Sequence, residues 1–210
     1  MSPGHKSVSA LLLAPGASAG RDQSALVAID HVLTERGLPV ERMDFPYRLA
    51  GRRVPDRQPV LVKSVVAAAK ELAEHRALPL EEIALGGRSM GGRMCSIAVA
   101  EGLLASALVL ISYPLHPPGR PEKLRVDHFG AIKVPCLFVS GTRDHFATPG
   151  ELEVATKAIV GPVTLVFLEG GDHGLRRREE DVAGLVGDWV LSLRALSRRQ
   201  RRAPPRPAAR

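Results

Sequence analysis

The chain has 210 residues, 45% of them hydrophobic and 24% charged, which is enough to bury the core of one ordinary domain. No apolar run approaches the length needed to cross a membrane, so we expect no membrane contact. The formal net charge of +7 arises at the C-terminal end, where seven arginines and no acids lie in the last seventeen residues. The rest of the chain has 22 basic and 22 acidic residues, which argues against a generally basic nucleic-acid-binding surface.

The C-terminal end is rich in Pro and Arg and contains no apolar anchors. Such a segment cannot bury enough surface to fold, so we predict a folded domain over residues 1–195 and a disordered tail over residues 196–210. A solvated extension is one interpretation of this tail. Weak, salt-sensitive contact with nucleic acid or an acidic partner is the alternative.

Apolar runs alternate with amphipathic segments along the chain, as in a parallel sheet covered by helices on both faces. We predict strands at Val8–Leu13, Pro39–Phe45, Ile83–Gly86, Leu108–Ser112, Cys136–Ser140 and Val163–Leu168. We predict helices at Asp22–Arg36, Pro59–Arg76, Met90–Glu101 and Glu151–Ile159, and a last one that includes Val182 and Leu193. The sequence thus predicts one α/β domain with about six mostly parallel strands and no separate cap domain.

A glycine-rich turn joins the third strand to the third helix. Gly87-Arg88-Ser89-Met90-Gly91 fits G-x-S-x-G, the nucleophile elbow, in which a strained turn presents the serine hydroxyl. Side chains two positions before and two after the serine would collide, so both positions are glycine. The alternative is a tight turn with a chance serine.

Two nucleotide-binding motifs compete for this turn, and both fail on detail. The glycines at 86, 87, 91 and 92 never supply the spacing of G-x-G-x-x-G. A P-loop requires Lys and Ser/Thr where this chain has Arg93-Met94. The turn therefore lacks the groups that hold a phosphate and its Mg²⁺.

A nucleophilic serine needs a base and an acid that orients the base. In this fold they follow the serine in the order acid, then histidine, each after a strand. Asp144 follows the fifth predicted strand and His173 follows the sixth, whereas the other histidines fail on order or position. We predict a catalytic triad of Ser89, Asp144 and His173, with Asp127 as an alternative acid.

The N-terminal stretch SALLLAPGASAG could be a secretory signal or a buried strand that enters a glycine turn. An oxyanion hole needs two N–H donors, and we predict these to be the amides of Ala17 and Met90. Cleavage after Ala19 would remove both the strand and one donor. We therefore assign the stretch to the fold and expect a cytoplasmic protein.

The two cysteines, Cys95 and Cys136, lie in apolar segments, so we expect buried thiols rather than a disulfide or a thiol metal site. The proposed chemistry requires no cofactor and no metal ion.

These motifs resemble the dienelactone-hydrolase-like superfamily of small α/β-hydrolases. Within it, the chain is most similar to the branch that contains testis-expressed protein 30 and the subunit-3-like protein of a histone acetyltransferase complex. The matching segments are LAPGASAG, DFPYRLAGRRVPDR, GGRSMGGRM, SGTRDHFATP and GGDHGL, within residues 7–195. The resemblance implies the same triad and the same two oxyanion-hole positions. This chain has Pro15-Gly16 where the relatives usually have His-Gly.

The sequence favours a serine hydrolase that cleaves a small ester or thioester, with a non-catalytic scaffold that binds a partner as the alternative. We expect the loops at 46–59 and 113–134 to shape the pocket and Gly16, Tyr47, Arg52 and Arg53 to bind substrate. Arg52 and Arg53, with Arg57, are candidates to recognise an acidic acyl group, or they pair with nearby carboxylates. Arg88 and Arg93 are interpreted as structural anchors of the elbow.

Overall fold

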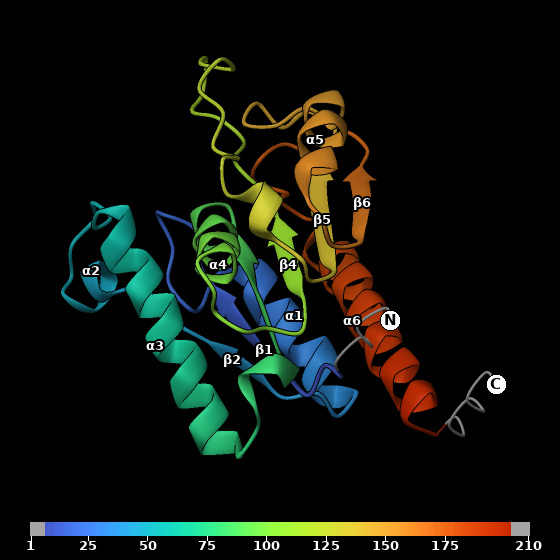
Figure 1. Cartoon of the computed structure of the whole chain (residues 1–210). Helices are drawn as coiled ribbons and strands as arrows, with labels where there is room; N and C mark the ends of the chain where they lie inside the picture. The colour runs from blue at the N-terminus through green and yellow to red at the C-terminus, as the bar shows by residue number, and fades with distance from the viewer. Residues whose placement is uncertain (1–6, 203–210) are drawn as a thin grey trace.

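A six-stranded parallel sheet forms the centre of the molecule in the computed structural model, which describes the backbone of residues 7–202 and the side chains of residues 7–196 (Figure 1). The strands are β1 (Ala10–Ala14), β2 (Val40–Arg42), β3 (Ile83–Arg88), β4 (Leu108–Ile111), β5 (Cys136–Gly141) and β6 (Val163–Leu168). Their spatial order is β2-β1-β3-β4-β5-β6, and every neighbouring pair is parallel. The predicted α/β fold is confirmed.

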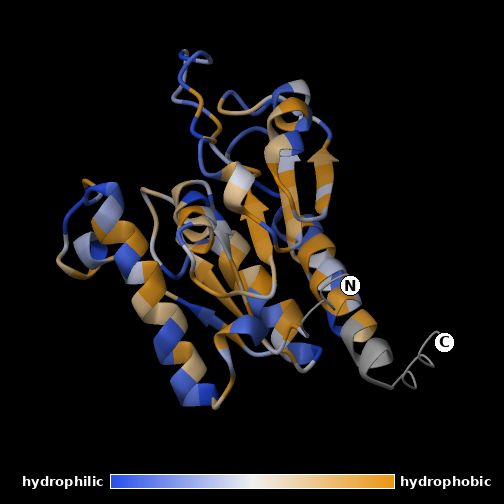
Figure 2. Cartoon of the chain, in the orientation of Figure 1, coloured by the Kyte–Doolittle hydropathy of each residue, from blue (hydrophilic) through white to orange (hydrophobic). Residues whose placement is uncertain are grey.

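Helices cover both faces of the sheet, because its central strands are apolar on both sides. The longer helices are α1 (Ser24–Glu35), α3 (Gln58–Arg76), α4 (Met90–Ala100) and α6 (Glu179–Arg202), and the short ones are α2 (Pro46–Leu49) and α5 (Pro149–Ala155). Leu11 and Leu13 of β1 pack with α1 and α6, whereas Leu12 and Ala14 pack with α3 and α4. Alternate residues of one strand therefore contribute to two separate cores. In Figure 2 the central strands are mostly hydrophobic, the edge strand β2 (Val40–Arg42) is hydrophilic, and α3 carries both hydrophobic and hydrophilic residues.

Two of the differences from the sequence prediction concern α2 and α6. A single turn of helix, α2, forms within the predicted loop 46–59, because Pro46 is well suited to the first turn of a helix and Tyr47 is fully buried. Helix α6 continues to Arg202, so the backbone of residues 196–202 is helical where a disordered tail was expected. Residues 203–210 of that tail lie outside the described residues.

The connections after the strands place the loops that matter for function at one edge of the sheet. Strand β1 lies between β2 and β3, so the chain reverses its direction of strand addition there. In such sheets a crevice opens beyond the carboxyl ends of the strands at that point. The connection from β4 to β5, here called the excursion (residues 113–134), extends beyond the carboxyl end of β4 (Figure 1).

Candidate active site

The turn between β3 and α4 holds Ser89 in a strained conformation. Its φ is +52° and its ψ is −117°, a combination that residues with a side chain seldom adopt. A Cβ atom at Gly87 or at Gly91 would lie 2.2 Å from the backbone oxygen of Ala14. The expected steric reason for these two glycines is confirmed, because β1 approaches both positions too closely for a side chain.

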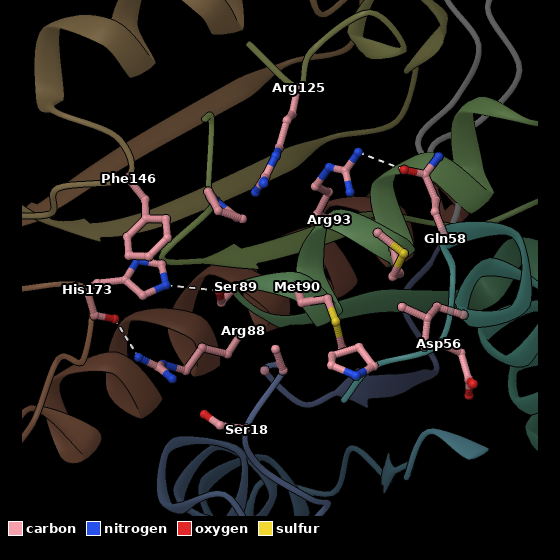
Figure 3. A pocket seen from close by; sticks show the side chains of 16 residues that line it. Ser18, Asp56, Gln58, Arg88, Ser89, Met90, Arg93, Arg125, Phe146 and His173 are labelled. Atoms are coloured by element: carbon pink, nitrogen blue, oxygen red, sulfur yellow. Dashed lines mark hydrogen bonds between the residues drawn. The ribbon is translucent and has the colours of Figure 1, made fainter. Parts of the chain in front are cut away.

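Three side chains form a continuous hydrogen-bonded chain at the carboxyl edge of the sheet. The Nε2 atom of His173 lies 2.9 Å from the Oγ atom of Ser89 (Figure 3). On the other side of the ring, Nδ1 lies 2.8 Å and 3.0 Å from the carboxylate oxygens of Asp144. Since a carboxylate only accepts, Nδ1 carries a proton and donates it, which leaves Nε2 to accept from the serine hydroxyl.

The acid and the base are held in place by their own surroundings. Asp144 is only 1% exposed and also accepts a hydrogen bond from the Phe146 amide at 2.8 Å. The Phe146 ring lies against the His173 imidazole with a centroid distance of 4.1 Å. Arg88 donates to the backbone oxygen of His173 and so ties the histidine loop to the elbow.

Arg88 is therefore the structural anchor that the sequence predicted. Burial lowers the pKa of its guanidinium, and the carboxylates of Asp144, Asp172 and Glu179 partly offset that effect.

The loop after β1 is fixed by two side chains from other elements. The Gly16 amide donates to Oε1 of Gln23 at 3.1 Å, and the Tyr47 hydroxyl donates to the Ala17 backbone oxygen at 2.6 Å. Within the described residues, neither the Ala17 amide nor the Met90 amide donates to a protein acceptor. Both residues line the cavity beside Ser89, so their N–H groups are free for a ligand.

A cavity of about 470 Å³ opens over the serine, a size in the range of small-molecule sites. Its wall comes from the loop after β1, the segment after α2, the elbow, the excursion and the histidine loop. The lining residues used below include Asp56, Gln58, Arg88, Arg93, Arg125 and Phe146. Within the part of the chain with described side chains, no group of three His, Cys, Asp or Glu residues is placed to hold a metal ion.

Three of the four predicted substrate-binding residues lie outside this wall. Gly16 lines the cavity, but Tyr47 is fully buried behind the loop after β1. Arg52 makes a two-point ion pair with Asp56, at 2.7 Å and 3.1 Å, as in the alternative interpretation. Arg53 is exposed, and neither arginine reaches the cavity.

The cavity wall includes several side chains that were not predicted to contact a substrate, among them Arg93, Arg125, Gln58 and Phe146. Arg93 was interpreted as an anchor, and it does donate to Gln58 Oε1 at 2.8 Å, but it also faces the cavity. Arg125 belongs to the irregular excursion, where no periodic pattern indicates which side chains turn inward. Only Phe146 carried a usable signal, since it lies two residues after the predicted acid.

Both cysteines are free, buried thiols, as expected. Burial raises the pKa of each to about 12, so neither forms a thiolate at neutral pH. No helix in the described part of the chain has the length and apolar character needed to cross a membrane.

Comparison with known proteins places these features in a family context. Residues 7–191 match the family model described as an alpha/beta hydrolase domain. The chain is also similar to an alpha-beta serine hydrolase homologue from Coxiella burnetii, with a TM-score of 0.70 and 19% identity over 89% of this chain and 86% of that one.

Two further solved structures share the fold. Est1E from Butyrivibrio proteoclasticus has a TM-score of 0.72 and 17% identity, over 92% of this chain and 90% of that chain. A dienelactone hydrolase from Anabaena variabilis has a TM-score of 0.71 and 20% identity, over 89% and 87%. At these identities the likeness concerns the architecture of the chain.

Proposed function

Because the chain belongs to the alpha/beta hydrolase domain family, we propose that it is a serine hydrolase that cleaves a small ester or thioester through an acyl-enzyme on Ser89. The observation that carries this proposal is the unbroken contact from Ser89 Oγ through His173 to the buried Asp144 carboxylate. A hydroxyl and an imidazole at 2.9 Å are within the reach that proton transfer requires.

In the first half of the reaction, Nε2 of His173 takes the Ser89 proton as the oxygen attacks the substrate carbonyl. Asp144 accepts the Nδ1 proton as a hydrogen bond and stabilises the imidazolium that forms. The Ala17 and Met90 amides donate to the oxyanion of the tetrahedral intermediate. His173 then protonates the leaving alcohol or thiol, and the acyl group remains on Ser89.

In the second half, water takes the place of the leaving group. His173 removes a proton from the water, whose oxygen attacks the acyl carbonyl. The same two amides stabilise the second oxyanion, and collapse of this intermediate returns the proton from His173 to Ser89 Oγ. The products are a carboxylic acid and the free enzyme, so no cofactor is consumed.

We further infer that the chain lies in the branch of the dienelactone-hydrolase-like superfamily that contains testis-expressed protein 30. The elbow GGRSMGGRM and the segment DFPYRLAGRRVPDR support this placement. The fixed loop at Pro15-Gly16, held through Gln23 and Tyr47, supports a working oxyanion hole despite the missing histidine.

Labelling with a fluorophosphonate probe tests the proposed function, because the probe reacts only with an activated serine. We expect labelling of the wild-type protein and none in Ser89→Ala. For any ester that the wild type hydrolyses, kcat should fall by roughly 10⁴-fold or more in Ser89→Ala. A folded wild-type protein whose Ser89 stays unlabelled would instead support the non-catalytic scaffold.

A further inference from the structure

Two guanidinium groups face the cavity without a carboxylate partner. Arg93 lies on α4, one turn after Ser89, and Arg125 comes from the excursion; both line the cavity. Among residues with described side chains, neither forms an ion pair with an acid. In Figure 3 the Arg93 guanidinium turns toward Gln58, and Arg93 lies on the opposite side of Ser89 from His173.

Arg93 is partly buried. Its Nε atom is buried and has no hydrogen-bond partner within the described structure. Burial lowers the pKa of its guanidinium, the positive charge of Arg125 lowers it further, and the Tyr113 hydroxyl offsets part of the shift. Two like charges thus share one partly desolvated space, an arrangement that costs free energy unless an anion joins them.

The acid in the cavity wall does not neutralise this pair. Within the described residues, Asp56 is the one carboxylate that lines the cavity, and both of its oxygens already accept from Arg52. Arg88, the third lining arginine, donates to the His173 backbone oxygen and lies near the Asp144 carboxylate. The uncompensated positive charge therefore belongs to Arg93 and Arg125.

We propose that Arg93 and Arg125 bind a carboxylate on the acyl part of the substrate, so that the preferred substrates are monoesters or thioesters of dicarboxylic acids. This inference rests on the proposed function. The leaving group must lie near His173, which protonates it. The acyl group is then expected to extend to the other side of Ser89, where Arg93 and Gln58 lie (Figure 3). A guanidinium pair suits a carboxylate because its planar donors match both carboxylate oxygens.

The sequence suggested that Arg52 and Arg53 recognise an acidic acyl group. We now assign this recognition to Arg93 and Arg125 instead. The Arg93 guanidinium donates to Gln58 Oε1 at 2.8 Å, and the Tyr113 hydroxyl donates to the Arg125 backbone oxygen at 3.2 Å. The Arg93 guanidinium and the Arg125 backbone are therefore each held by a neighbour before a substrate arrives.

A binding experiment on the Ser89→Ala protein tests this inference without turnover. The ligands are ethyl hydrogen adipate and ethyl adipamate, which differ only in a carboxylate against an uncharged carboxamide of the same shape. The glutarate and pimelate pairs vary the chain length. By isothermal titration calorimetry, we expect the acid of at least one pair to bind roughly 10- to 100-fold more tightly than its amide.

Charge-removing variants connect the preference to the two arginines. In the Ser89→Ala background, Arg125→Gln and Arg93→Gln should each reduce the acid-over-amide ratio at least fivefold, and Arg125→Lys should restore part of it. Arg120→Gln is the matched control, because Arg120 is an exposed arginine of the same excursion that lies outside the cavity wall. Arg120→Gln should keep the acid-over-amide ratio of the Ser89→Ala protein. Far-UV circular dichroism checks that each variant folds.

The outcomes separate this inference from the proposed function. If no acid binds more tightly than its amide, or if the preference survives in Arg93→Gln/Arg125→Gln, the carboxylate site is wrong even when Ser89 reacts with the fluorophosphonate. If the preference is present but Ser89 remains unlabelled, the carboxylate site stands and the hydrolase assignment fails.

Discussion

Ser89 occupies the conformation that a type II′ turn gives to its first central residue, a position usually taken by glycine. The cost of such a conformation in a residue with a Cβ is about 1–3 kcal/mol. The fold bears this cost because the same turn directs the hydroxyl toward His173. Strain at this residue is therefore tied to the chemistry that we propose.

Replacing Ser89 by Gly and by Ala separates strain from chemistry. Both variants lack the nucleophile, but only glycine relieves the backbone. Glycine loses more conformational entropy on folding than alanine, and this loss offsets part of the strain that it relieves. We therefore expect Ser89→Gly to be about 1 kcal/mol more stable than Ser89→Ala. Urea unfolding measures the difference, and equal stability of the two variants would mean that the turn is not strained.

Tyr47 acts on the site through the Ala17 backbone, to which its hydroxyl donates at 2.6 Å. In Tyr47→Phe the loop loses this restraint, so the Ala17 amide, the oxyanion-hole donor that we propose, is held less firmly in place. We expect kcat to fall roughly tenfold, less than the loss of a whole donor would cause, with KM changed little. The free energy of unfolding should fall by about 1 kcal/mol.

Thr156→Val provides the control for the lost hydroxyl. Thr156 is buried, and its hydroxyl donates to the Leu152 backbone oxygen at 2.7 Å, outside the cavity. This variant should lose similar stability and keep its kcat. Equal kcat values for Tyr47→Phe and the wild type would show that the tyrosine supports the fold alone.

At the scale of elements, the contact between β1 and α4 allows no side chain at Gly91. A Cβ atom there would lie 2.2 Å from the Ala14 oxygen and 2.5 Å from the Pro15 oxygen. Gly91→Ala must therefore move the helix or the strand, and we expect a loss of more than about 3 kcal/mol in unfolding free energy. Gly184 of α6 has open space at the same position, so Gly184→Ala should stabilise the protein by about 0.5–1 kcal/mol.

Thermal or urea unfolding of the two alanine variants gives the comparison. Both changes add one methyl group to a helical glycine, so their difference reports packing rather than helix propensity. A small effect in Gly91→Ala would mean that β1 and α4 can separate without cost.

The excursion is joined to α4 through His128, whose Nε2 atom lies 2.8 Å from Ser96 Oγ. Burial lowers the pKa of this histidine to about 4, and the nearby Arg93 charge acts in the same direction, while Asp127 opposes it. The unfolded chain thus binds a proton near pH 6.5, which the folded protein takes up only near pH 4. Neutral His128 therefore makes its full contribution to the free energy of unfolding above pH 6.5, and this contribution is lost as the pH falls toward 4.

His128→Gln removes this titration. Relative to the variant, the wild type should lose roughly 1–2 kcal/mol between pH 7 and pH 4, a range that allows for screening of a partly exposed ring. Urea unfolding at several pH values measures both proteins, and the comparison cancels the carboxylates that titrate in each. Parallel pH profiles would show that His128 is not held neutral by the fold.

Most elements could be predicted because their signals are local. The strands β1, β3, β4 and β5 are continuous apolar runs that pack on both faces, and α3 shows a clear helical period. Strand β2 was predicted too long because only three of its residues pair with β1. The turn α2 was missed because four residues are too few to show a period.

The site residues could likewise be predicted only where the sequence carries a local signal. Ser89, Asp144 and His173 could be proposed as partners because each follows a strand of a recognisable fold, in a fixed order. Arg125 could not, because its approach to Arg93 depends on the path of an irregular segment. Arg52 and Tyr47 carry suitable chemistry, yet an ion pair and complete burial direct them elsewhere.

At the scale of the whole molecule, the two cores lie on opposite faces of one sheet, and the candidate site lies at the edge that both support. Helices α1 and α6 pack against each other on one face and α3 and α4 on the other. Among the residues with described side chains, the fully buried residues of α6 extend from Val182 to Val190, and Leu191 and Leu193 also pack against this core. This part of α6 thus contributes to the stability of the domain.

The contact between Ser89 and His173 joins residues 84 positions apart in the chain. Between them the polypeptide must add β4, β5 and β6 to the sheet through successive parallel crossovers, each of which closes a long loop before its strand can pair. Helical circular dichroism can recover during refolding while these loops are still open. The proposed hydrolysis requires Ser89 and His173 to be in contact, so it cannot recover until these loops have closed. The return of activity therefore reports that the last strand has paired with the sheet.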